Sequence, residues 1–141
     1  MSESNELKGQ CLCGSITISA KSESNSVGAC HCKTCRRWGG GPFMEIDCGQ
    51  AVTIDGDEHL SVFNSSDWAE RGFCNKCGSH LFYRLKGTGQ HMVPIGLFDD
   101  RDDLAFTHQV FIDEKPSYYH FGNETKDMTG AEIFAMFGGS D

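Results

Sequence analysis

The sequence predicts a mainly β domain of antiparallel sheets, with a short helix towards the C-terminal end. Short segments with a strand-like pattern follow one another along most of the chain. Turn signals such as Asp55-Gly56-Asp57 and Lys86-Gly87-Thr88-Gly89 separate these segments. In addition, seven of the eight cysteines fall into three tight groups, a clustering typical of metal binding.

The chain of 141 residues is long enough for one domain with its own core. We expect residues 1–6 to be a disordered tail and residues 7–141 to form a single zinc-binding domain. The net charge of −8 argues against nucleic acid as a partner. The polar N-terminal residues do not resemble a signal peptide, and no apolar run is long enough to span a membrane. We therefore expect a cytoplasmic protein whose thiols stay reduced.

The strand predictions begin with residues 7–20, where Ile16 and Ile18 alternate with polar neighbours. Cys11 and Cys13 lie two apart in this segment, so in a strand their side chains would share one face. Residues 33–38 are expected to form a short helical turn. Residues 129–137 are expected to form a helix that Thr129 caps and Gly138 ends. The remaining strands are expected at 43–48, 51–54, 59–63, 69–74, 81–85, 91–97 and 106–112.

Two of the cysteine groups combine into a closed metal site. Cys74 and Cys77 form a Cys-X-X-Cys pair followed by Gly78, the pattern of a zinc knuckle. Together with Cys11 and Cys13 they supply four sulfurs, the full ligand set of a tetrahedral structural zinc. Loss of such a site is expected to unfold the protein.

The third group, Cys30, Cys32 and Cys35, supplies only three thiolates and so leaves one zinc position open. Catalytic zinc sites keep such a position, and a soft thiolate of a substrate suits it. Arg36 and Arg37 follow directly, and they are candidates to bind the carboxylates of an acidic thiol such as glutathione.

Other interpretations of these residues stay open from the sequence. Cys48 can complete the three-thiol group as a fourth ligand, or it can be a buried inert thiol. His31 can coordinate the metal, support its ligands or be exposed. Cys32 and Cys35 can form a redox pair, although no βαβ pattern surrounds them. Arg36 and Arg37 can simply be solvated charges.

Four motifs follow one another along the chain: Gly9-X-Cys11-X-Cys13-Gly14, Cys30-His31-Cys32-X-X-Cys35-Arg36, Phe73-Cys74-X-X-Cys77-Gly78 and Gly96-Leu97-Phe98-Asp99. Together they resemble the glutathione-dependent formaldehyde-activating enzyme family, which also includes centromere protein V. The resemblance spans residues 7–119, and the last motif departs from the family's usual Gly-Thr-Leu-Asp run at its two middle residues.

The resemblance implies a β-tent fold, which this family shares with methionine sulfoxide reductase B. It implies one structural zinc at the four-cysteine set and a second zinc, tied to activity, at Cys30, Cys32 and Cys35. The activity it implies is formation of S-hydroxymethylglutathione from glutathione and formaldehyde, a carbon–sulfur lyase reaction. The alternatives are a non-catalytic zinc module that binds glutathione or a protein, and a sulfoxide reductase. The sequence leaves the particular substrate and the oligomeric state open.

Overall fold

The computed structural model describes residues 6–99 and 102–136. The chain divides into two compact units, each made of two stretches of sequence. Unit 1 comprises residues 1–25 and 46–103, and unit 2 comprises residues 26–45 and 104–141. Strand β4 (Phe43–Gly49) begins in unit 2 and ends in unit 1. The expectation of a single domain stays a prediction.

One sheet of unit 1 consists of three antiparallel strands in the order β1-β2-β5. They are β1 (Glu6–Gln10), β2 (Thr17–Lys21) and β5 (Val52–Asp55). In β2, Ile18 and Ala20 are buried while their neighbours are exposed, as expected for a strand with one face on the core. Glu6, which we expected in the tail, already belongs to β1, and residues 1–5 lie outside the described residues.

The other strands of unit 1 pair antiparallel in the order β9-β8-β7-β6. They are β6 (Leu60–Asn64), β7 (Ala69–Cys74), β8 (His80–Leu85) and β9 (His91–Pro94). Phe82 is fully buried, and its ring packs on Gly72, where a Cβ atom would lie 2.4 Å from the ring. The predicted strands of this region are confirmed, except that β9 stops at Pro94 and a 3₁₀ helix (Ile95–Leu97) follows it.

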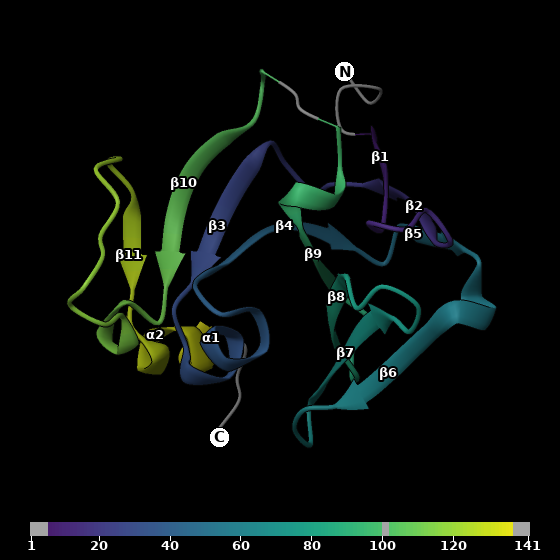
Figure 1. Ribbon diagram of the computed structural model, residues 1–141. Helices are drawn as coiled ribbons and strands as arrows, with labels where there is room; N and C mark the ends of the chain where they lie inside the picture. The colour runs from purple at the N-terminus through teal and green to yellow at the C-terminus, as the bar shows by residue number, and fades with distance from the viewer. Residues whose placement is uncertain (1–5, 100–101, 137–141) are drawn as a thin grey trace. The chain divides into compact units, whose positions relative to one another are not determined.

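Unit 2 contains parallel pairing, which the prediction of antiparallel sheets did not include. Its strands are β3 (Ser26–Cys30), β10 (Ala105–Val110) and β11 (Lys126–Met128), in the order β11-β10-β3. Strand β10 runs parallel to both neighbours, side by side as Figure 1 shows. Neither β3 nor β11 was predicted. The chain as a whole is mainly β, as expected, with sheets of mixed direction.

Two helices lie near the C-terminal ends of these parallel strands, α1 (Lys33–Gly39) and α2 (Gly130–Met136) (Figure 1). The predicted cap of α2 is confirmed: the Glu132 N–H donates to Thr129 Oγ1 at 3.2 Å, and the Thr129 N–H donates to Glu132 Oε1 at 2.8 Å. The expected end of this helix at 137–138 lies outside the described residues.

The first turn of α2 packs against Phe111, whose backbone has a positive φ of 54°. Its ring leaves no room for a side chain at Gly130, because a Cβ there would lie 2.7 Å from the ring. Phe134 meets the same ring edge-on, with centroids 5.7 Å apart. A 3₁₀ helix (Ile112–Glu114) follows directly, so packing on α2 fixes where that segment begins.

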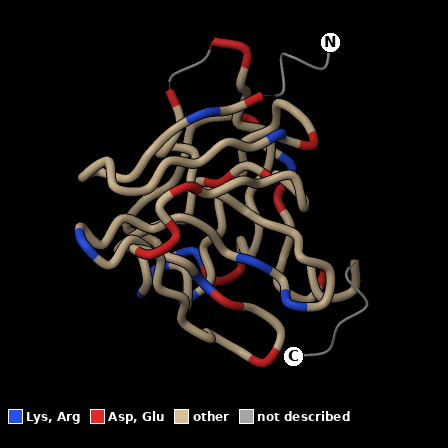
Figure 2. The backbone as a smooth tube through the Cα atoms, turned by 90° about the vertical axis from the view of Figure 1, so that its right-hand side faces the viewer, with Lys and Arg blue, Asp and Glu red and all other residues tan. Residues whose placement is uncertain are grey.

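Acidic and basic positions are interspersed along the described chain (Figure 2). Among the described residues, no helix is both long enough and apolar enough to cross a membrane.

Candidate functional site

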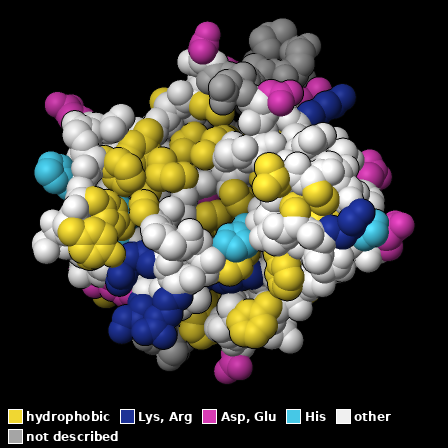
Figure 3. Space-filling model, viewed as in Figure 1, with side chains coloured by type: hydrophobic (Ala, Val, Ile, Leu, Met, Phe, Trp, Pro, Cys, Tyr) yellow, Lys and Arg dark blue, Asp and Glu magenta, His cyan; other side chains and the backbone are white. Residues whose placement is uncertain are grey.

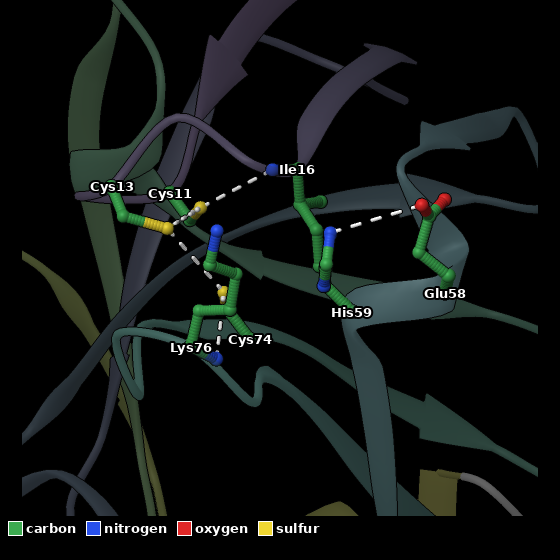
Figure 4. Close-up of polar contacts among 7 residues, drawn as sticks. All are labelled: Cys11, Cys13, Ile16, Glu58, His59, Cys74 and Lys76. Carbon is green, nitrogen blue, oxygen red and sulfur yellow. Dashed lines mark hydrogen bonds and ion pairs between the residues drawn. The ribbon is translucent and has the colours of Figure 1, made fainter.

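Unit 1 brings the first four predicted ligands together. All four Sγ atoms of Cys11, Cys13, Cys74 and Cys77 lie within 4.8 Å of one another. The Cys13 sulfur is 3.7 Å from that of Cys11 and 3.8 Å from that of Cys74 (Figure 4). Zinc–sulfur bonds of about 2.3 Å in a tetrahedron place sulfurs about 3.8 Å apart. The spacing of these thiols therefore fits a closed zinc site.

The Cys11–Cys13 pair lies in a turn, and the prediction that both residues lie in a strand was wrong. Strand β1 ends at Gln10, and the Gly14 N–H donates to the Cys11 carbonyl at 3.1 Å. Gly14 has a φ of 81°, which a side chain would disfavour. The turn directs both sulfurs towards one point. In an extended strand the two side chains would share a face but would not converge as closely.

The Cys74–Cys77 pair has a similar turn at the end of β7. The Gly78 N–H donates to the Cys74 carbonyl at 2.8 Å, and Gly78 also has a φ of 81°. The Lys76 N–H points at the Cys74 sulfur at 3.4 Å (Figure 4). The knuckle conformation expected for this motif is therefore present.

Two serines that were not predicted from the sequence make the thiols of Cys13 and Cys77 more acidic. Ser79 Oγ lies 3.2 Å from Cys77 Sγ, and hydrogen bonds from the Ser79 hydroxyl and N–H lower the pKa of Cys77 to about 5. Hydrogen bonds from Ser15 lower the pKa of Cys13. Burial raises the pKa of Cys74. Ser79 also accepts a hydrogen bond from the Leu12 N–H at 2.9 Å, so it joins the two turns.

Unit 2 brings together the other three predicted ligands. Cys30 ends β3, Cys32 caps α1 and Cys35 lies in the first turn of that helix. Their Sγ atoms also lie within 4.8 Å of one another. The Cys32 sulfur accepts the Cys35 N–H at 3.3 Å, which fixes its direction. Glu114 Oε1 accepts the Lys33 N–H at 2.9 Å and so holds the start of the helix.

Crowding and burial make this cluster hard to ionise without a cation. Hydrogen bonds with Cys32 and Cys35, together with burial, raise the pKa of the Cys30 thiol. Cys30 and Cys35 are buried, and Cys32 is half-buried. Three thiolates so close together require a positive partner, and a soft divalent metal is the partner that sulfur prefers. The donor set therefore fits zinc with three protein ligands.

The structure places His31 beside this cluster as a support for it. Its side chain is fully buried, and both ring nitrogens have partners. Nδ1 lies 2.8 Å from the Tyr119 hydroxyl, and Nε2 lies 2.7 Å from Gln109 Oε1. Burial lowers the pKa of His31 and so favours the neutral ring. With both nitrogens occupied, His31 has no lone pair for a metal.

The two arginines after the cluster differ in surroundings. Arg36 is half-buried, and its Nε donates to the His31 carbonyl at 2.9 Å. Arg37 is exposed in the last turn of α1. Figure 3 shows Lys and Arg side chains gathered at the lower left, over the end of unit 2 that carries α1. Arg36 therefore braces the ligand loop, whereas Arg37 points its charge to solvent.

Cys48 belongs to neither group of converging sulfurs among the described residues. It is fully buried in β4.

Comparison with known proteins shows the family of this chain. The sequence pattern of the family described as glutathione-dependent formaldehyde-activating enzyme matches residues 6–114, which include both cysteine clusters. The chain belongs to this family.

A relative in Schizosaccharomyces pombe, described as an uncharacterized lyase, is 36% identical over 129 residues. The alignment covers 91% of this chain and 94% of the relative. A crystal structure of a Rhodobacter sphaeroides protein matches with a TM-score of 0.59 at 21% identity. It covers 67% of this chain and 90% of that one, and it supports the fold alone.

Proposed function

We propose that the protein is a zinc-dependent lyase of the carbon–sulfur type, which acts on the adduct of formaldehyde with a small thiol such as glutathione. Membership of the family and the lyase name of the S. pombe relative support this proposal. The observation that carries it is the three-thiol cluster in unit 2, which offers three converging ligands where four fill a closed zinc site.

The two clusters have separate tasks in this proposal. Cys11, Cys13, Cys74 and Cys77 hold a structural zinc, and Cys30, Cys32 and Cys35 hold a second zinc. When bound there, zinc supplies a positive charge that favours the thiolate form of a thiol substrate. Because the chain carries eight thiols, we place the reaction in the reducing cytoplasm.

The reaction adds a thiol to formaldehyde, and it needs no reactant besides these two. The thiol sulfur bonds to the formaldehyde carbon, the carbonyl π bond opens, and the thiol proton ends on the carbonyl oxygen. The reverse reaction breaks the same carbon–sulfur bond. The chain's own residues orient the thiol: Arg37 offers an exposed guanidinium for a glutathione carboxylate, and Arg36 holds the ligand loop.

Exchange spectroscopy by NMR tests the function directly, because it follows interconversion of glutathione and formaldehyde with their adduct at equilibrium. We expect zinc-loaded protein to accelerate this exchange, and Arg37→Ala to raise the KM for glutathione about 3- to 10-fold, as loss of one exposed charge-assisted hydrogen bond would. Lys126→Ala, which removes an exposed charge from β11, is the matched control. Glutathione binding without accelerated exchange would instead support the non-catalytic binding module.

A further inference from the structure

A chain of side-chain hydrogen bonds leads away from the three-thiol cluster to the protein surface. It begins at Tyr119 and His31 and continues through Gln109, whose Nε2 donates to Thr125 Oγ1 at 2.9 Å. Thr125 Oγ1 in turn lies 2.6 Å from Asp127 Oδ1. Gln109 is buried in β10, whereas Asp127 is exposed in β11. All five residues belong to unit 2.

The carboxylate of Asp127 fixes the direction of every bond in this chain. An ionised carboxylate only accepts, so the single hydroxyl proton of Thr125 points to Asp127. Thr125 then has only lone pairs for Gln109, which must turn its NH₂ towards Thr125 and its oxygen towards His31. A neutral imidazole has one N–H, and it must lie on Nε2 to meet that oxygen. Nδ1 therefore accepts the proton of the Tyr119 hydroxyl.

We propose that Asp127 is a positioning residue for the three-thiol cluster, because through Thr125 and Gln109 it fixes the tautomer of His31. His31 lies between two of the ligand cysteines, so its orientation sets theirs. The same chain turns the Tyr119 proton inwards and leaves the phenol oxygen as an acceptor for any further group. Metal-ligand loops commonly depend on such outer hydrogen bonds.

Two further observations support this inference. The backbone of His31 is anchored as firmly as its ring: its N–H donates to the Val110 carbonyl at 3.1 Å and its carbonyl accepts from Arg36. Tyr119, Thr125 and Asp127 also lie beyond residues 6–114, which match the family pattern. The support for the cluster thus comes partly from a segment outside that pattern.

Imidazole ¹⁵N NMR of the zinc-loaded protein tests the proposal, because it distinguishes a proton on Nε2 from one on Nδ1. We expect the Nε2–H tautomer for His31 in the unaltered chain and in Thr125→Ser, which keeps the hydroxyl. Asp127→Ala and Thr125→Val should each populate the Nδ1–H tautomer. They should also weaken zinc binding at the three-thiol cluster about 10-fold, measured by chelator competition. The control variant is Glu124→Gln, which removes an exposed carboxylate three residues from Asp127. It should change neither the tautomer of His31 nor the zinc affinity of the three-thiol cluster.

An Nδ1–H tautomer in the unaltered chain would overturn the proposal. So would an unchanged tautomer in both Asp127→Ala and Thr125→Val, or unchanged zinc affinity in variants whose tautomer has switched. The two variants are independent, so one that fails to fold leaves the other as the test. This inference rests on the proposed function in one respect: it assumes that zinc binds at the three-thiol cluster. A protein that shows the tautomer pattern but no turnover would refute the function and leave the role of Asp127 intact.

Discussion

The two cysteine clusters use the same ligand atom, yet they differ in number of sulfurs and in surroundings. The cluster of unit 1 has four thiols on two glycine-ended turns, and serines lower the pKa of Cys13 and Cys77. The cluster of unit 2 has three thiols at a strand end and a helix start, and its neighbours raise the pKa of Cys30. In the proposed function, the first set of sulfurs closes a zinc site, and the second leaves one zinc position for a ligand.

Removal of one ligand from the closed cluster should have the largest effect. Structural zinc contributes about 10–16 kcal/mol in zinc-finger peptides, which is comparable to the whole stability of a domain. We therefore expect Cys74→Ser to abolish the cooperative thermal unfolding transition followed by circular dichroism. A normal transition in this variant would show that the four thiols do not hold the fold together.

Removal of one ligand from the open cluster should affect activity and spare the fold. Cys35→Ser is expected to lose one of two zinc ions per chain in metal analysis. Turnover should fall by more than about 100-fold, because partners outside the ligand set alone cost about 10- to 100-fold. The thermal transition should be retained. Loss of all zinc together with the fold would mean that both clusters are structural.

Acidification should empty the two clusters at different pH values. A thiol with a lowered pKa stays in the thiolate form that binds zinc as the pH falls. Its contribution to zinc binding is lost only when the pH falls through the pKa of the folded protein, which is about 5 for Cys77. The pKa of Cys30 is shifted in the opposite direction, upwards. Protons therefore compete with zinc for this thiol at a higher pH. We expect a chromogenic chelator to detect zinc release from the three-thiol cluster first. Cys35→Ser should lack this first phase.

The smallest effect is expected at Cys48, whose thiol is buried outside both clusters. Cys48→Ala should leave the zinc content unchanged and destabilise the protein by about 1 kcal/mol, as is common for a small core truncation. A drop to one zinc per chain would make Cys48 the fourth ligand of the second site. That result would remove the open position on which the proposed function depends.

Local patterns in the sequence were sufficient for most of unit 1. Strand β8, for example, lies between Gly78 and the Lys86-Gly87-Thr88-Gly89 turn, so its position could be predicted. The Cys11–Cys13 turn could not, because Ile16 and Ile18 beyond it made the whole segment resemble one strand. Pro94 was a signal for the end of β9 that the prediction overlooked.

Unit 2 depends more on contacts between distant segments. Strand β3 is buried along nearly its whole length and contains Gly28, so it shows no alternation. Strand β11 has three residues and exists through its pairing with β10. The sulfur ligands could be found from their spacing. The partners of His31 could not, because Gln109 and Tyr119 are 78 and 88 residues away and carry no local motif.

The position of these partners along the chain has a consequence for biosynthesis. All ligands of the closed cluster have been synthesised once Cys77 is made, whereas the open cluster has its thiols by Cys35 but lacks Gln109, Tyr119 and Asp127 until much later. The packing of Phe111 is likewise incomplete until Gly130 and Phe134 have been synthesised. A growing chain therefore carries three unsupported thiols through most of its translation. These thiols are most open to oxidation or to the wrong metal on the ribosome, before the native fold protects them.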